Sequence, residues 1–120
     1  MKIRMRGNSI RLRLTKSEVE SLQSEGKVLE TVKIGSNEFR YELVAIDNDT
    51  PLASYSDHTI TISLPIKFTT SWFDNDVVGI QHVQVNSDGS ELMLLIEKDF
   101  ACLDNTFEDQ SDNYVNPKAC

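Results

Sequence analysis

Two histidines, two cysteines and an acidic group near the C-terminus are the side chains that could bind a metal ion or take part in catalysis. They are His58, His82, Cys102, Cys120, Glu108, Asp109 and Asp112. The sequence has no Cys-x-x-Cys pair and no His-Glu-x-x-His motif, which are the spacings that indicate zinc sites. The acidic group also lacks the glycine and the closing glutamate of an EF-hand calcium loop. We therefore assign no metal ion and no cofactor, and the candidate ligands that remain are Cys102, His58, His82, Glu108, Asp109 and Asp112.

Nucleophilic catalysis would need a cysteine or serine within hydrogen-bond reach of a base. Cys102 and His82 are far apart in the sequence, and their spacing gives no reason for them to meet. No serine stands in a Gly-x-Ser-x-Gly motif. We assign no catalytic residue and favour a small non-enzymatic binding or protein-interaction domain. The alternative is a small metal-dependent or thiol-based enzyme that uses Cys102, a histidine and the C-terminal acids.

The N-terminal segment has a strongly basic face. Residues 1–16 contain six Lys or Arg and no acid, and apolar and basic residues alternate around Gly7-Asn8. A two-residue turn there predicts a hairpin. It sets Lys2 opposite Arg13 and Arg4 opposite Arg11, and like charges in such pairs destabilise a sheet. We expect this basic face (Lys2, Arg4, Arg11 and Arg13) to meet Glu108, Asp109 and Asp112, solvent, or an external anion, which is a phosphorylated ligand, an acidic partner or nucleic acid.

One helix and several further strands are expected to position these residues. Thr15 and Glu18 form a capping box and Gly26 is a C-terminal cap, which predicts a helix over residues 16–25. Strands are expected over 28–34, 38–46, 52–55, 59–64, 79–85 and 91–97. A two-residue Asp88-Gly89 turn would set His82 opposite Leu95. The aromatic pair Trp72-Phe73 is expected in the core at a loop corner, with a protein-contact patch as the alternative, and residues 71–74 are expected to cap one short helical turn. We find no internal repeat in the sequence.

Length and composition indicate a folded domain with a real core. The chain has 120 residues, of which 39% are hydrophobic and 26% charged, and its net charge is −7. We expect one domain over residues 1–120, with 99–120 an irregular acidic segment. The net charge disfavours nucleic acid as a partner. No apolar run reaches the roughly 20 residues of a membrane span, and no signal peptide is evident. We expect a cytoplasmic protein that does not bind membranes, with a protein partner or a second copy as its partner.

The predicted fold class is α+β. We expect an antiparallel, strongly twisted or barrel-like sheet of six to eight strands, with one short helix near the N-terminus. Edge strands would need a cover, which the acidic segment or a second subunit could provide.

Two segments of the chain resemble an uncharacterised family of small bacterial proteins of unknown function. They are the opening, KIRMRGNSIRLRLT, and the C-terminal pieces EKDFACL and EDQSDNYVNP. The resemblance covers about the whole length and is carried by the two ends. It implies a bacterial, cytoplasmic, stand-alone domain, and it assigns no functional residue.

Overall fold

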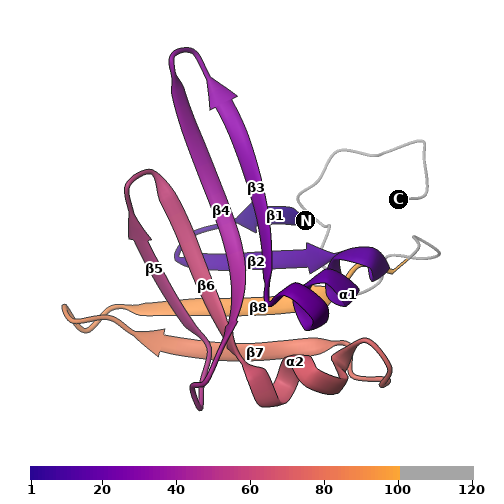
Figure 1. Cartoon of the computed structure of the whole chain (residues 1–120). Helices are drawn as coiled ribbons and strands as arrows, with labels where there is room; N and C mark the ends of the chain where they lie inside the picture. Colours follow the sequence, from indigo (N-terminus) through magenta and orange to yellow (C-terminus); the bar gives the residue numbers. More distant parts are fainter. Residues whose placement is uncertain (101–120) are drawn as a thin grey trace, which may run out of the picture.

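Two four-stranded sheets and two helices make up residues 1–100, the part of the chain that the computed structural model describes (Figure 1). Sheet A has the strand order β1-β2-β8-β7, and sheet B has the order β3-β4-β6-β5. The strands are β1 (Lys2–Met5), β2 (Ser9–Leu14), β3 (Lys27–Ile34), β4 (Asn37–Ile46), β5 (Leu52–Ser56), β6 (Thr59–Pro65), β7 (Gly79–Val85) and β8 (Glu91–Lys98). The helices are α1 (Lys16–Glu25) and α2 (Ile66–Trp72).

Both sheets are mixed, and within the described residues neither closes into a barrel. Each consists of two antiparallel hairpins whose inner strands run parallel to each other, β2 beside β8 in sheet A and β4 beside β6 in sheet B. The α+β class and the upper end of the expected strand number are confirmed. The prediction was one antiparallel, strongly twisted or barrel-like sheet. A single sheet, purely antiparallel pairing and closure are wrong, because hairpins distant in the sequence pair in parallel to form two open sheets. The prediction of a single helix is also wrong, since α2 follows β6.

The order of elements repeats once along the chain. The series β1-β2-α1-β3-β4 is followed by β5-β6-α2-β7-β8, and each sheet contains one hairpin from each series. The register repeats too. Ile3 lies opposite Leu12 in sheet A, and Ala53 lies opposite Ile62 in sheet B, 50 residues further along the chain. The two halves are therefore related by a pseudo-twofold axis between the sheets, a repeat that the sequence analysis missed.

Backbone hydrogen bonds at the strand ends follow the same symmetry. Ala45 N donates to Gly26 O at 2.9 Å, and the equivalent bond in the second half runs from Lys98 N to Val78 O at 2.8 Å. At the opposite strand ends, a bond from Met93 N to Asn8 O at 3.0 Å corresponds to one from Arg40 N to His58 O at 2.9 Å. The two halves of the chain therefore agree in individual backbone hydrogen bonds as well as in topology.

The cap residues explain why α1 forms where the sequence predicts it. Thr15 Oγ1 accepts a hydrogen bond from Glu18 N, and the Glu18 carboxylate accepts one from Thr15 N at 2.8 Å. Gly26 ends the helix in the left-handed conformation, with φ of 76°, which costs a glycine little. Since α2 has no capping side chain and is rich in β-branched residues, its helix depends on packing rather than local propensity.

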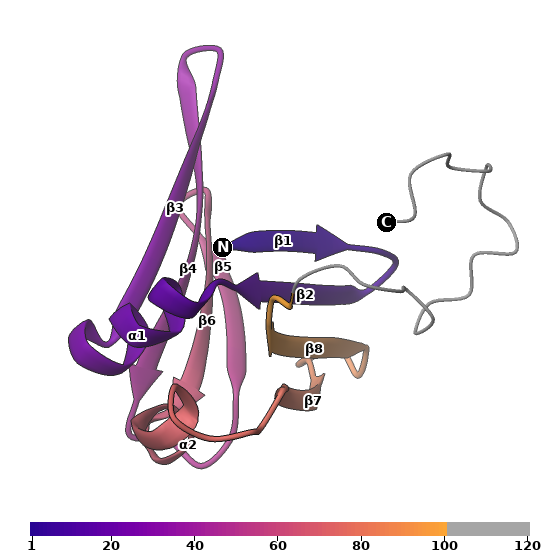
Figure 2. The same cartoon turned by 90° about the vertical axis from the view of Figure 1, so that its right-hand side faces the viewer.

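The core lies between the sheets, where the two helices close one end. Trp72 of α2 is fully buried, and its Nε1 donates to Val77 O at 2.8 Å, so the prediction that it belongs to the core is confirmed. The other fully buried large side chains come from both sheets and α1, namely Leu12, Leu14, Leu22, Leu43, Ile62, Leu64, Leu94 and Ile96. Figures 1 and 2 show α1 and α2 side by side at this end. The strands of sheet A run across those of sheet B, so the hairpin ends diverge.

The hairpin of β7 and β8 has a different register from the predicted one. Asn86 N donates to Ser90 O at 2.8 Å, which leaves a three-residue loop with Gly89 at φ of 87°. His82 therefore lies opposite Leu94 and not Leu95. By contrast, all four predicted pairs of β1 and β2 are confirmed.

Candidate functional site

A groove lies between the diverging hairpin ends of the two sheets. It has a volume of about 460 Å³ and is open to solvent. We call it the axial groove, because it lies where the pseudo-twofold axis leaves the molecule. Its lining residues are Met5, Asn8, Ile10, Phe39, Ala53, Ser54, Tyr55, Ile60, Gln84, Asn86 and Leu92.

Equivalent positions of the two halves supply most of the apolar lining. The symmetry-related pairs are Met5 with Tyr55, Ile10 with Ile60, and Phe39 with Leu92. All six occupy strand positions that face the opposite sheet, because alternate residues of a strand point to the same side. Met5 and Tyr55, at the strand ends, remain 55% and 63% exposed. The groove thus exposes apolar surface, and removing this surface from water would be favourable in free energy.

Ser54 and three amide side chains are the polar residues of the lining besides Tyr55, and each amide is engaged within the protein. Gln84 accepts from Ala53 N at 2.7 Å and donates to Ala53 O at 3.0 Å. Asn86 accepts from Gln84 at 3.2 Å, and Asn8 donates to Glu91 O at 2.7 Å. These amides hold the walls of the groove in place.

No side chain with a charge at neutral pH lines the axial groove. It therefore contains no carboxylate, imidazole or amine that could move a proton, and no ligand set for a metal ion. Such a surface can bind an uncharged apolar group, and among its lining residues the hydroxyls of Ser54 and Tyr55 have no charged base beside them to activate them. The sequence analysis missed it because the lining comes from seven strands and two turns of both halves. The signal in the sequence that could have indicated the groove was Met5 and Tyr55, two large side chains with apolar surface next to turns.

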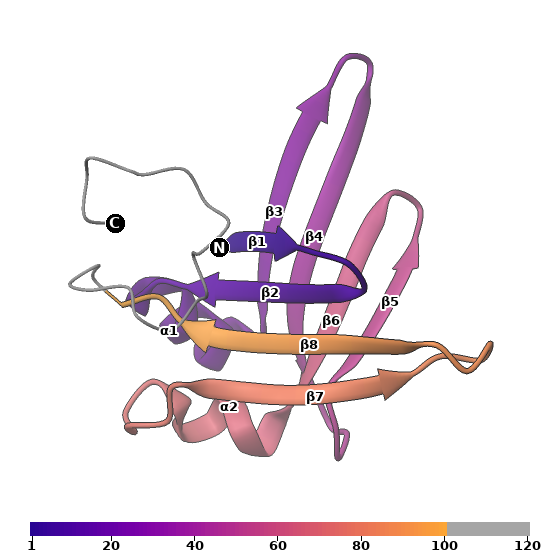
Figure 3. The same cartoon turned by 180° about the vertical axis from the view of Figure 1, so that it is seen from behind.

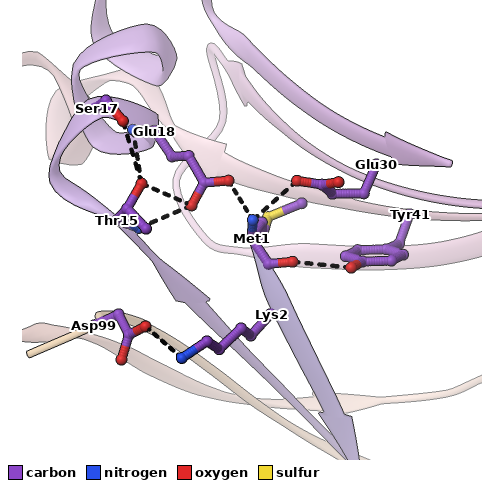
Figure 4. Close-up of polar contacts among 8 residues, drawn as sticks. All are labelled: Met1, Lys2, Thr15, Ser17, Glu18, Glu30, Tyr41 and Asp99. Atoms are coloured by element: carbon purple, nitrogen blue, oxygen red, sulfur yellow. Dashed lines mark hydrogen bonds and ion pairs between the residues drawn. The ribbon is translucent and has the colours of Figure 1, made fainter. Parts of the chain in front are cut away.

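The basic face has the predicted geometry and acidic neighbours that the sequence analysis did not identify. Glu97 of β8 accepts from the Arg11 guanidinium at 2.6 Å and from Arg13 Nε at 2.9 Å. Lys2 Nζ lies 2.9 Å from the Asp99 carboxylate (Figure 4). Arg4, opposite Arg11 in the register, also has an interaction partner. Part of the basic face is therefore neutralised within the chain. The expected partners Glu108, Asp109 and Asp112 lie outside the described residues.

A second polar cluster surrounds the α-amino group of Met1 (Figure 4). The amine donates to the carboxylates of Glu18 and, at 2.9 Å, Glu30, while Tyr41 OH donates to Met1 O at 2.9 Å. Burial alone would lower the pKa of the amine, but hydrogen bonds to Glu18 and Glu30 and their charges outweigh it and raise the pKa above 8.0. Burial also raises the pKa of Tyr41, aided by the charges of both carboxylates.

The pKa of Glu18 shifts in the direction expected for an ion pair. Burial would raise it, but hydrogen bonds from the Met1 amine and from Thr15, together with the positive charge of the amine, lower the pKa below 4.5. The cluster fastens the start of β1 to α1, β3 and β4. Its groups are mutually satisfied, which is typical of a structural role.

The candidate catalytic and metal-binding residues are not brought together in the described part of the chain. His58 lies in the turn between β5 and β6, with φ of 58°, and His82 lies in β7. No group of three or more His, Cys, Asp or Glu side chains in residues 1–100 could hold a metal ion. Cys102, Cys120, Glu108, Asp109 and Asp112 lie outside the described residues, so the enzyme alternative stays a prediction.

A smaller hollow of about 290 Å³ lies beside α1. Its lining is Leu14, Lys16, Val19, Phe73, Lys98, Asp99 and Phe100. Its charged groups are engaged in part: Lys98 Nζ donates to Asn75 O at 2.7 Å and lies 5.9 Å from the centre of the Trp72 ring. Asp99 pairs with Lys2.

Neither α1 nor α2 has the length and apolar character of a membrane-spanning helix.

Comparison with known proteins identifies a family but no activity. No curated protein and no solved structure matches the chain. One family model, described as a family of unknown function (DUF7009), matches residues 1–118. This match agrees with the predicted membership of an uncharacterised family. Because it covers nearly the whole sequence, the chain belongs to the DUF7009 family.

Proposed function

We propose that this chain is a non-enzymatic binding domain whose axial groove takes an uncharged, mainly apolar small molecule. The observation that carries the proposal is the lining: eleven residues without a formal charge, in a protein of which 26% of the residues are charged. A charged ligand would lose its hydration there without gaining an opposite charge. The volume of about 460 Å³ also lies within the usual range of small-molecule sites.

The symmetry of the groove supports a ligand that contacts both halves at once. Ile10 and Ile60 line its inner part, and Met5 and Tyr55 line its mouth. A ligand seated between them would bury apolar surface of both sheets, at roughly 25 cal/mol per Å². Because the walls are held by Gln84 and its neighbours, little of this gain is lost in ordering the site.

An uncharged fluorescent probe, N-phenyl-1-naphthylamine, tests this proposal. We expect its fluorescence to rise on addition of the wild-type protein and to saturate at one probe per chain. Tyr55→Lys and Met5→Lys should each weaken binding by about tenfold, since each removes apolar contact and brings a charge to the mouth.

The matched control is Leu52→Lys, on the same strand as Tyr55 but on the opposite face. Leu52 is 49% exposed, so its replacement should leave both folding and probe binding unchanged. Equal loss in all three variants, or no saturable binding by the wild type, would contradict the proposal. Binding of a polypeptide but not of the small probe would also contradict it.

The basic face supports a second candidate function, the binding of an acidic protein partner. Four cations lie on two adjacent strands, and Lys2 is 74% exposed although it pairs with Asp99. Several arginines on one face suit bidentate contacts with carboxylates. Changing Arg4 and Arg11 to Glu should abolish capture of an acidic partner from cell extract or sharply lower stability. If both are unchanged, the basic face has neither role.

A further inference from the structure

At the outer edge of β5, a single side-chain amide satisfies both backbone hydrogen-bonding groups of one residue. Gln84 of β7 accepts from Ala53 N at 2.7 Å and donates to Ala53 O at 3.0 Å. Figure 3 shows β5 as the outer strand of sheet B, with the β7–β8 hairpin crossing near its start. An edge residue of β5 is thus matched by one amide group, whose C=O and N–H both reach it.

The backbone N–H and C=O of Tyr55 face the same way as those of Ala53. In an antiparallel pair, residues whose groups bond to the partner strand alternate with residues whose groups point away from it. Ala53 lies opposite Ile62 and Tyr55 lies opposite Ile60, two positions along the β5–β6 pair. Since Gln84 reaches the groups of Ala53 from outside the sheet, those of Tyr55 also point outward. Within residues 1–100, no hydrogen bond engages this outward pair.

The axial groove meets the edge of β5 where this pair lies. Ala53, Ser54 and Tyr55 are consecutive and all line the groove, although side chains of successive residues in a strand point to opposite faces. The groove therefore follows the backbone of β5 as well as its inner face. Asn86 also lines the groove, and its amide oxygen accepts from Gln84 at 3.2 Å rather than from Tyr55 N. The pair at Tyr55 is left to a ligand.

The first half of the chain has no such amide at the corresponding place. Val32 lies opposite Phe39 as Gln84 lies opposite Leu92, so a valine stands where the second half has a glutamine. The hydrogen-bonding arrangement therefore belongs to one wall of the groove. It gives a bound molecule a defined orientation in a site whose apolar lining is otherwise close to symmetric.

We propose that the ligand of the axial groove carries a primary carboxamide or a lactam, whose C=O accepts from Tyr55 N and whose N–H donates to Tyr55 O. This inference rests on the proposed function and names the polar group of that ligand. In both groups an N–H and the C=O lie on the same side of the amide, as they do in the Gln84 side chain that serves Ala53. The apolar body of the ligand then lies against Ile10 and Ile60.

The number of open groups favours one amide over an added polypeptide strand. A strand that pairs along β5 would need outward-facing N–H and C=O groups at alternate residues. Gln84 already takes those of Ala53. The outward positions beyond these two are Pro51, which has no N–H, and Asp57, which lies in the turn with φ of 52°. Tyr55 alone remains, and one amide group matches it.

Two ligands of nearly the same shape, 2-naphthamide and 2-acetylnaphthalene, test the proposal on the wild-type chain. Both have a carbonyl, but only the amide has an N–H to donate. In competition with N-phenyl-1-naphthylamine, we expect the dissociation constant of 2-naphthamide to be about fivefold lower, as one further hydrogen bond would give. Equal affinities, with the fluorescent probe still bound, would overturn this inference and leave the proposed function standing. Failure of the wild type to bind the probe would contradict the proposed function, and this inference with it.

Two substitutions at position 55 test the backbone N–H itself. Tyr55→Pro and Tyr55→Val both remove the ring, but only proline removes the N–H, which an edge strand tolerates where that group points outward. We expect 2-naphthamide to bind Tyr55→Pro about fivefold more weakly than Tyr55→Val. N-phenyl-1-naphthylamine has no carbonyl and should bind the two variants alike. Equal binding of 2-naphthamide by two folded variants would overturn the inference, and if Tyr55→Pro does not fold, the ligand pair on the wild type decides.

Discussion

Gln84 on β7 engages both backbone hydrogen-bonding groups of one residue on β5, Ala53. Its Oε1 accepts from Ala53 N at 2.7 Å, and its Nε2 donates to Ala53 O at 3.0 Å. A side-chain amide here takes the place of a neighbouring strand and joins sheet A to the edge of sheet B. Both residues line the axial groove, so this contact also sets the position of its walls.

Replacing this amide should loosen the junction between the sheets. We expect Gln84→Leu to lower the free energy of unfolding by about 1–3 kcal/mol, because the buried backbone groups of Ala53 lose their partners. Urea denaturation measures the change. Gln81→Leu, on the exposed face of the same strand, is the control and should have a much smaller effect. Equal losses in the two variants would mean that the contact with Ala53 contributes nothing specific.

Glu97 should be the residue on which the stability of the basic face depends most. It accepts from both Arg11 and Arg13 and is largely buried, so Glu97→Gln should cost about 1–2 kcal/mol at low salt. The loss should shrink as salt is added, since screening weakens both the attraction and the repulsion between the arginines. Chemical denaturation at two salt concentrations measures both effects.

The control for this prediction is Glu91→Gln, which removes an exposed carboxylate from the start of the same strand. It should change stability by less than 0.5 kcal/mol or so, as is typical of surface substitutions. A salt-independent loss in Glu97→Gln would show that the ion pairs are not its cause.

The pH dependence of stability should reflect the cluster at Met1. The pKa of Glu18 is lowered from 4.5 on folding. The stability that Glu18 contributes is therefore complete at pH values above 4.5 and is lost as the pH falls through the folded pKa. The pKa of the Met1 amine is raised from 8.0, so its contribution is complete below that value and is lost as pH rises through the folded pKa. The cluster therefore stabilises the fold most between these two values.

Glu18→Gln should reduce stability within that window and flatten both limbs of the profile relative to the wild type. Thermal melts over a series of pH values measure this difference. Glu20→Gln, exposed on the same helix, should leave the shape of the profile unchanged. If Glu18→Gln merely shifts the whole curve downward, the cluster contributes through packing and capping rather than charge.

Local sequence signals predicted the parts of the fold that are determined locally. The Thr15–Glu18 capping box gave the bounds of α1, and the Gly7-Asn8 turn gave the register of β1 with β2. The Asp88-Gly89 pair failed as a register signal because the loop contains one residue more than a two-residue turn. A shift of one residue moves every side chain to the other face of the strand.

The parallel pairs and the partners of the basic face depend on contacts that local patterns do not encode. Glu97 reaches Arg11 because β8 lies beside β2, more than 80 residues away along the chain. The repeat is visible in the sequence only as a spacing of 50 between buried apolar positions, such as Leu14 and Leu64. The axial groove follows from that symmetry, so it could not be predicted while the repeat was missed.

Mapping the probe by NMR on the isotope-labelled full chain is the most direct test of the axial groove as the binding site. Titration with N-phenyl-1-naphthylamine should shift backbone amide signals of the lining residues, with the largest changes at Ile10, Phe39, Tyr55, Ile60 and Leu92. Signals of the outer face of sheet B, such as Thr31 and Lys33, should stay in place. Shifts concentrated around α1 and Phe73, or no shifts at millimolar probe, would contradict the account.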